Sequence, residues 1–192
     1  MTVGLLAIML NESDYVERWI RAVKRFPDSF DRIVVVDGGS TDGTVTRLRD
    51  AGIEVTERTF ENHFADQRNA GCAHVDTDWI LELDADEVAS SPLLGGLRAI
   101  VGDAEKAGVD CVGLPRLNFI DGVLVAGPGH MGLDFQYRLH RRSCRWRGAV
   151  HEEVVGYRAR YELRIADGHF IVHDKSGVRH AARNQYYQTI RP

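Results

Sequence analysis

Cysteine is scarce in this sequence, and long apolar runs and an excess of basic residues are both missing. The three cysteines, Cys72, Cys111 and Cys144, are too few and too unevenly spaced for a disulfide framework or a zinc knuckle, which favours a reducing cytoplasm. No apolar run approaches the roughly 20 residues that a membrane-spanning helix needs, so any membrane association is expected to be peripheral, at the inner face. The formal net charge of -4 gives the whole molecule no electrostatic reason to bind nucleic acid.

The composition is that of a folded protein with a full hydrophobic core. The chain has 192 residues, of which 44% are hydrophobic and 27% charged. This length fits one domain better than two, and no linker, repeat or low-complexity tract divides the chain. We therefore expect a single domain over residues 1–192. Residues 3–10 lack a basic leader and a cleavage site, and they are expected to form a strand rather than a signal peptide.

Residues 1–109 alternate short apolar runs with helical patterns. This alternation is typical of βαβ units and predicts an α/β fold with a mainly parallel central sheet flanked by helices. Ser13 is the expected N-cap of the first helix, whose apolar positions recur at helical spacing from Val16 to Val23 before Pro27 ends it. The expected strands are 3–10, 33–36, 53–56 and 79–83, and the later expected helices are 44–50, 65–75 and 92–107.

Residues 110–192 show a different pattern, with strands of alternating or mixed polarity. Turn residues break them at 121–122, 127–129 and 167–168, which predicts a mixed or antiparallel half that shares the core of the first. A helix is expected over 178–190. Five arginines between Arg138 and Arg147 form a basic stretch, which is either a solvated face or an anion site for a diphosphate or an acidic acceptor.

Acidic residues follow two of the predicted strands at their carboxyl ends. Asp37 follows the second strand, and Asp84-Ala85-Asp86-Glu87 follows the fourth. Ligands of open α/β sheets bind beyond these ends. Two carboxylates one residue apart suit a hard cation such as Mg²⁺ or Mn²⁺ that retains open positions for phosphate. Asp-x-Asp also occurs on solvated turns, but its place directly after a buried strand favours the metal site.

The glycine-rich segment after Asp37 has two interpretations. Asp37 followed by two glycines is ordinary turn chemistry, and the alternative is a carboxylate that accepts a hydrogen bond from a nucleobase. The segment lacks the Gly-x-Gly-x-x-Gly order of dinucleotide folds and the Gly-Lys-Ser/Thr of a phosphate loop. Nicotinamide and ATP are therefore disfavoured as ligands.

Five segments, taken in order, carry a resemblance to a known family. They are residues 7–12, 34–44, 67–71, 79–87 and 146–152, which read AIMLNE, VVVDGGSTDGT, QRNAG, WILELDADE and WRGAVHE. The chain resembles glycosyltransferase family 2, of the GT-A fold. It is similar in particular to a small branch that contains lipopolysaccharide core β-glucosyltransferases and peptide S-glycosyltransferases. The resemblance implies a nucleotide-sugar-binding half over 1–109 and an acceptor and catalytic half over 110–192.

The resemblance also implies roles on the donor side. Asp37 would contact the donor base, Asp84 the ribose or the metal, and Asp86 the metal directly. Arg68 would approach the nucleotide or its phosphates, with an ordinary helix-surface arginine as the alternative. Asn11 and Glu12 would line the same donor pocket, unless they only serve the entry into the first helix.

The acceptor side needs a base that deprotonates the incoming nucleophile. Glu152 is the leading candidate, followed by Glu153 and Asp134. Histidines offer a further metal ligand through neutral imidazole, and His173 and His151 are the candidates for it. His169 and His173 are expected on one face of a strand over 169–173. A hydrogen-bonded histidine at a sheet edge is the alternative for each.

The sequence and the resemblance together predict a metal-dependent inverting glycosyltransferase. It would move a hexose from a nucleotide diphosphate sugar, with UDP-glucose as the default donor, to a hydroxyl or thiol. The acceptor class stays open between a saccharide, a lipid-linked glycan, a protein side chain and a nucleobase, and a homo-oligomer is one way to bind it. The alternatives are a binding domain without turnover and a sugar-nucleotide nucleotidyltransferase. The second lacks its usual glycine-rich basic loop after the first strand.

Overall fold

The computed structural model describes residues 1–125 and 133–190 of the chain. The turn expected at 127–129 lies outside the described residues. In chain order the elements are β1 (Val3–Met9), α1 (Val16–Lys24), η1 (Pro27–Ser29), β2 (Arg32–Asp37), α2 (Thr44–Asp50), β3 (Glu54–Glu57), α3 (Phe64–His74), β4 (Trp79–Glu82), β5 (Glu87–Ala89), α4 (Ser91–Lys106), β6 (Cys111–Ile120), β7 (Val123–Leu124), β8 (Leu133–Arg141), β9 (Arg145–Arg147), β10 (Glu153–Val155), β11 (Arg160–Glu162), η2 (Ile165–Asp167), β12 (Ile171–Lys175) and α5 (Gly177–Thr189).

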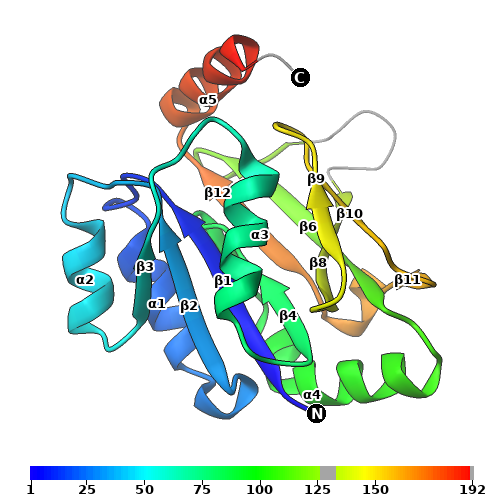
Figure 1. The fold of residues 1–192 in the computed structure, drawn as a ribbon. Helices are drawn as coiled ribbons and strands as arrows, with labels where there is room; N and C mark the ends of the chain where they lie inside the picture. Colours follow the sequence, from blue (N-terminus) through cyan, green and yellow to red (C-terminus); the bar gives the residue numbers. More distant parts are fainter. Residues whose placement is uncertain (126–132, 191–192) are drawn as a thin grey trace.

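One sheet runs through both halves of the chain in the order β3-β2-β1-β4-β8-β6-β12-β5 (Figure 1). The pairs among β3, β2, β1 and β4 are parallel, whereas β8 is antiparallel to β4 and to β6. The short strands β9 and β10 form a separate antiparallel pair. The predicted α/β class, with a parallel first half and a mixed second half, is therefore confirmed.

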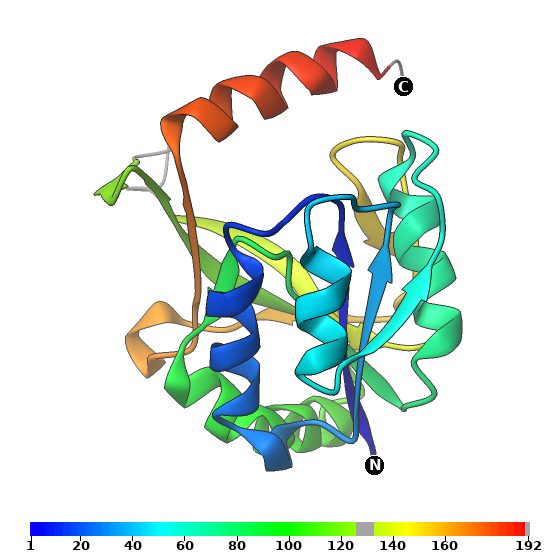
Figure 2. The same ribbon diagram turned by 90° about the vertical axis from the view of Figure 1, so that its left-hand side faces the viewer.

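Hydrophobic side chains cover both faces of the sheet. Along β1, Leu5 and Ala7 belong to a cluster with α1, α2 and α4, whereas Leu6 belongs to a second cluster with α3 and Trp146. This division follows from the period of two along a strand, which points successive side chains to opposite faces. Figure 2 shows α1 and α2 on one face and α3 on the other. A strand covered on both faces is nearly all apolar, as β1 is.

The entry into α1 differs from the prediction. Ser13 was expected to cap the helix, but the N-cap is Tyr15 and it makes no side-chain cap bond. The backbone N–H of Ser13 instead donates to Asp42 at 2.9 Å. The carbonyl of Glu12 accepts from the N–H groups of both Tyr15 and Val16 at 2.9 Å, so a turn precedes the helix. The start of α1 therefore depends on a contact between residues that are 29 positions apart, which sequence periodicity cannot predict.

The last helix, α5, lies over the end of the sheet to which the carboxyl ends of β1 and β2 point (Figure 2). None of its residues is buried, in contrast to α4, which buries six. Polar and aromatic contacts rather than a buried apolar face therefore hold α5 in place. Within residues 1–125 and 133–190, no helix combines the length and the hydrophobicity needed to span a bilayer.

Candidate active site

A cavity of about 720 Å³ lies between the carboxyl ends of the strands and α5. Seven of the candidate site residues line it, although they come from distant parts of the chain: Glu12, Arg68, Asp84, Asp134, His151, Glu152 and His173. Asn11, Asp37 and Asp86 are not among its lining residues. The sheet therefore brings the candidate donor residues and the leading candidate base to one cavity.

Arg68 lies on α3 at the wall of this cavity, and its guanidinium is almost fully buried. Each of its three nitrogens donates to a different carboxylate: Nε to Glu152 at 2.8 Å, NH1 to Glu82 at 3.0 Å and NH2 to Asp84 at 2.8 Å. The helix-surface alternative for Arg68 does not apply, because the side chain is internal. Arg68 joins the candidate base to the candidate donor motif.

Asp84 follows β4 and is bound by two arginines. Its Oδ1 accepts from Arg68, and its Oδ2 accepts from Arg138 on β8 at 2.8 Å. Burial acts to raise the pKa of Asp84, but Arg138 and Arg68 outweigh burial and hold that pKa well below its usual range. Asp84 is therefore ionised and held in a fixed position at the cavity wall.

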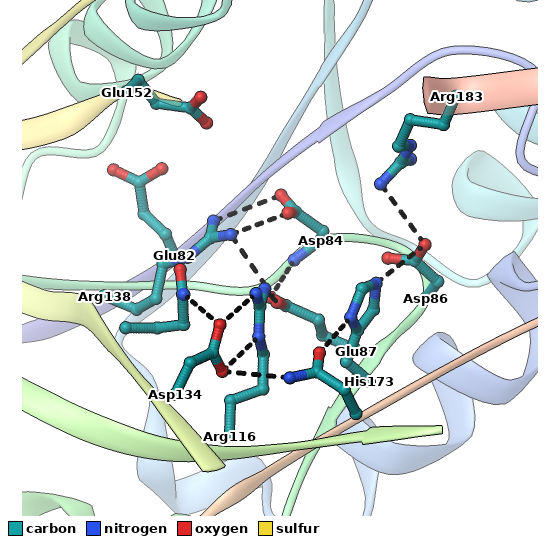
Figure 3. A network of polar contacts seen from close by, with 12 residues as sticks. Glu82, Asp84, Asp86, Glu87, Arg116, Asp134, Arg138, Glu152, His173 and Arg183 are labelled. Carbon is teal, nitrogen blue, oxygen red and sulfur yellow. Dashed lines mark hydrogen bonds and ion pairs between the residues drawn. The ribbon is translucent and has the colours of Figure 1, made fainter. Parts of the chain in front are cut away.

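Asp86 has a different environment, although it is only two residues away (Figure 3). Its carboxylate is fully buried and neither oxygen has a hydrogen-bond partner in the described part of the chain. His173 Nε2 stands 3.4 Å from Oδ2, Arg183 NH1 stands 3.5 Å away and Arg179 Nε 3.6 Å away. Burial acts to raise the pKa of Asp86, yet His173 and Arg183 keep it below its ordinary value. Both oxygens of this buried carboxylate make ion pairs or no contact rather than hydrogen bonds, and such oxygens are the ligands that a hard cation takes.

His173 is oriented as metal-binding histidines usually are. It lies on β12, and its Nδ1 stands 2.8 Å from Asn118 Oδ1. The amide nitrogen of Asn118 donates to Asp134, so its oxygen faces the imidazole and the Nδ1–H donates to it. Nε2 then faces Asp86 Oδ2 at 3.4 Å (Figure 3). A hydrogen bond that fixes the tautomer and the ring in this way typically supports a metal ligand.

Asp37 and Asn11 make turn contacts. Asp37 Oδ2 accepts from the N–H groups of Gly39 and Ser40, both at 2.8 Å, and Oδ1 accepts from the Ser40 hydroxyl. Asn11 Oδ1 accepts from the N–H of Thr41 at 2.8 Å. These bonds tie the end of β1 to the loop after β2 and shape the cavity edge at Gly38. The turn interpretation of Asp37 thus describes its contacts, and the role in base binding stays a prediction.

Glu12 is a buried carboxylate at the end of β1, and both of its oxygens accept from Arg179 NH2. Burial raises the pKa of Glu12 to about 7, although Arg179 acts to lower it. Glu12 thus faces the cavity and contacts α5 at the same time. The alternative role of Glu12, at the entry into the first helix, explains the hydrogen bonds of its backbone carbonyl. It does not explain the contacts of its side chain.

The three candidate bases lie in different places. Glu152 lines the cavity and its side chain is 14% exposed, with Arg68 as its partner. Glu153 is exposed on β10 and pairs with Arg147, and it does not line the cavity. Asp134 lines the cavity, but its oxygens accept from Arg116, Asn118 and Gln136. Of the three, Glu152 combines a place at the cavity with a single ion-pair partner.

The other two histidines lie apart from Asp86. The ring of His151 packs edge-on against Tyr187 of α5, with 5.6 Å between the ring centroids. His169 precedes β12, which begins at Ile171 rather than at residue 169 as predicted. Its Nε2 is close to Gly96 on α4. The contacts of His173, and not those of His151 or His169, therefore include the carboxylate of Asp86.

A second group of potential metal ligands is buried beneath the cavity. Ligand atoms of Cys72, Glu82 and His140 lie within 4.8 Å of one another. Glu82 already accepts from Arg68 and from the indole N–H of Trp146, and burial raises the pKa of the Cys72 thiol. A protonated thiol is not a metal ligand, and this disfavours a cation at the cluster. Through the bond between Glu82 and Arg68, this cluster helps to fix the Arg68 side chain.

Comparison with known proteins decides the family. The model of glycosyl transferase family 2 matches residues 6–186. The chain belongs to glycosyl transferase family 2. The expected family is thereby confirmed, and the matched range contains every candidate site residue of this family 2 chain.

Its relatives include glycosyltransferases with longer chains. Glycosyltransferase SunS of Bacillus subtilis (strain 168), derived from prophage SPbeta, is 29% identical over 159 residues, which are 82% of this chain and 35% of SunS. An uncharacterized glycosyltransferase of Rickettsia bellii is 33% identical over 91 residues, which are 47% of this chain and 30% of that protein. The family 2 chain therefore spans about a third of the length of these curated relatives.

Solved structures confirm the GT-A fold class for the family 2 chain. The crystal structure of S. aureus TarS 1-349 in complex with UDP-GlcNAc aligns with a TM-score of 0.62 and 15% identity. The alignment covers 91% of this chain and 59% of that one. At this level of identity the likeness concerns the fold.

Several cavity residues of the family 2 chain were missed by sequence reasoning: Arg116, Lys175, Arg179 and Arg183. Arg138 belongs to the basic stretch, and it alone of the five arginines lines the cavity. Among the others, Arg141 pairs with Glu105 and Asp110, Arg142 with Asp76, and Arg147 with Glu153. The solvated-face interpretation therefore fits most of the stretch. The spacing of four residues between Lys175, Arg179 and Arg183 was a sequence signal that these three cations lie near one another.

Proposed function

We propose that this chain transfers a hexose from a UDP-sugar, with UDP-glucose as the default donor, to a hydroxyl or thiol with inversion at the anomeric carbon. The observation that carries the proposal is the buried carboxylate of Asp86, which accepts no hydrogen bond from the described residues and lies 3.4 Å from Nε2 of His173. Family membership and the UDP-GlcNAc in the TarS crystal structure support the donor class. The three free thiols suit a reducing compartment, which supports the expected cytoplasmic location.

Asp86 and His173 would hold a divalent cation, Mn²⁺ or Mg²⁺, and Asp84 would contact the donor ribose or share the cation. The cation would neutralise charge on the leaving diphosphate. Oxygen from a carboxylate and nitrogen from an imidazole are a donor set that both chelates such an ion and leaves open positions. Gly38 lines the cavity, and the contacts of Asp37 and Asn11 hold the adjoining loop, where the nucleoside would lie.

Glu152 would act as the base. Its carboxylate takes the proton from the acceptor hydroxyl or thiol while the acceptor atom forms a bond to the anomeric carbon. The bond between that carbon and the diphosphate oxygen breaks on the opposite face, and UDP leaves with the electron pair. Arg68 holds Glu152 at the cavity wall, and its other nitrogens hold Asp84, so base and donor keep a fixed relation.

A thermal-shift experiment with a matched control tests the donor site. We expect UDP to raise the melting temperature of the wild-type protein by about 5 °C or more at saturating concentration, and only with Mn²⁺ or Mg²⁺ present. Asp86→Asn should lose this metal-dependent shift. Asp103→Asn, which changes an exposed carboxylate on α4, should keep it. A shift that persists without metal and in Asp86→Asn would contradict the donor site.

A turnover assay separates the enzyme from a binding domain. Wild-type protein with UDP-glucose, Mn²⁺ and a panel of hydroxyl and thiol acceptors should release UDP faster than protein-free controls. If UDP-glucose binds and no UDP is released with any acceptor or with water, the binding-domain alternative holds.

A further inference from the structure

Lys175 is a cavity residue without a counter-ion. It ends β12, lines the cavity and is partly buried. Within residues 1–125 and 133–190, no carboxylate lies at ion-pair distance from its ammonium group, and its side chain makes no hydrogen bond. The neighbouring carboxylate, Asp174, pairs with Arg18 at 3.5 Å on the other side of the strand. An ammonium group kept among other cations in a partly enclosed cavity needs a compensating anion.

Lys175 begins a row of three cations. Arg179 and Arg183 follow at intervals of four residues, so they share one face of α5, and both line the same cavity. Figure 3 shows Arg183 reaching from α5 toward Asp86. Among the described residues, the carboxylates at ion-pair distance from this row are Glu12 and Asp86, whereas the nearby Asp84 is bonded to Arg68 and Arg138. The row therefore carries an excess positive charge toward the cavity.

The two arginines are also incompletely bonded. Charge-assisted hydrogen bonds between guanidinium and carboxylate are typically about 2.7–2.9 Å long. Arg183 NH1 stands 3.5 Å and Arg179 Nε 3.6 Å from Asp86, and Arg179 Nε is a buried donor with no hydrogen-bond partner in the described part of the chain. Donors remain on both side chains for a further acceptor. Arg116 is another cation of this cavity, but it does not belong to the row, since its donors are bonded to Glu87 and Asp134.

We propose that Lys175, Arg179 and Arg183 form a subsite that binds a phosphoryl group next to Asp86. A phosphoryl group offers several anionic oxygens to donors that converge from a strand end and a helix face. The inference rests on the proposed function, within which the group is either the diphosphate of the donor or a phosphate on the acceptor. Both sources share the chemistry that the three cations recognise.

The test compares Lys175→Gln with Lys24→Gln, since Lys24 belongs to the last turn of α1 and lies outside the cavity. Isothermal titration with UDP and with uridine, both in Mn²⁺, measures the phosphate contribution. Lys175→Gln should weaken UDP binding about tenfold to a hundredfold and leave uridine binding unchanged. Lys24→Gln should bind both as the wild type does. A melting temperature of Lys175→Gln equal to the wild type, or higher, verifies the fold.

A second titration identifies the source. Inorganic phosphate is added to protein saturated with UDP and Mn²⁺. If the wild type binds this phosphate and Lys175→Gln does not, while Lys175→Gln keeps its affinity for UDP, the subsite belongs to an acceptor phosphate. Wild-type affinities of Lys175→Gln for both UDP and phosphate would overturn the subsite and leave the donor site standing. If wild-type protein binds phosphate through Lys175 but not UDP, the subsite stands and the donor proposal fails. If it binds neither, both fall.

Discussion

The guanidinium of Arg68 serves three carboxylates with three separate nitrogens. A lysine ammonium has three donors, but it lacks the planar fork that holds three acceptors in fixed directions. A guanidinium taken this far out of water is stable only because the carboxylates surround it, and they in turn depend on it. The Arg68 side chain therefore links the position of Glu152 to that of Asp84.

Replacing Glu152 by glutamine tests the base without removing its partner. The glutamine oxygen still accepts from Arg68 Nε, so the variant should keep the fold and the affinity for UDP. It cannot take a proton from the acceptor, and we expect transfer to fall by about a hundredfold or more. Steady-state rates of UDP release, together with UDP titration, measure the two effects. Glu153→Gln, an exposed neighbour, is the matched control, and a Glu152→Gln enzyme with normal transfer would assign the base elsewhere.

Glu12 should make stability depend on pH. Burial raises its pKa from 4.5 to about 7, so the folded protein binds a proton that the unfolded chain releases between these values. Stability from this group is therefore present below pH 4.5 and is lost as pH rises toward 7. The loss is about 3 kcal/mol, since a pKa change of one is worth about 1.4 kcal/mol. Between pH 5 and pH 8 the melting temperature of wild type should fall relative to Glu12→Gln, and parallel curves would contradict this.

At the scale of elements, the sequence predicted those that show a regular helical or strand pattern. The patterns of β2, α2, α3, α4 and α5 placed their bounds within one or two residues. The strand β5, Glu87–Ala89, was missed because it is three residues long, begins at the last residue of the acidic motif and is defined by its pairing with β12. Long-range pairing of this kind leaves no local pattern. The same holds for α5, whose helix was predicted but whose place over the cavity was not.

The stability of the packing of α5 against the rest of the molecule should depend on the salt concentration. Its contacts include Arg179 with Glu12, Arg183 with Asp86, and Tyr187 against Phe64, and it buries no residue. Screening shortens the Debye length from about 10 Å at 0.1 M to about 3 Å at 1 M salt, so the charged contacts weaken. Amide hydrogen exchange in α5 should become several-fold faster between these concentrations, whereas exchange in α4 should change little. Equal salt responses in both helices would contradict this account.

For the whole molecule, the sequence predicted which residues lie close together. It was less informative about the contacts that each of them makes. Asp84 and Asp86 were placed at a strand end by a local pattern, and Glu152 and His173 were associated with them by family resemblance. The different surroundings of Asp84 and Asp86 depend on Arg138 and Arg183, which lie more than 50 residues away in the chain. Ion pairs across such separations follow from topology, and neither spacing nor composition reports them.

The shared sheet predicts that the two halves unfold together. Strand β4 pairs with β8 over Trp79–Leu81, and Leu139 and Ile171 from the second half pack in one cluster with Leu5 and Leu81 from the first. A fragment of residues 1–109 would expose one edge of β4 and part of this cluster, so it should lack a cooperative transition. Urea unfolding of the whole chain, followed by far-ultraviolet circular dichroism and by tryptophan fluorescence, should give one coincident transition. The prediction of one domain over residues 1–192 would be wrong if the fragment unfolded cooperatively by itself, because its core would then be complete without β8 and β12.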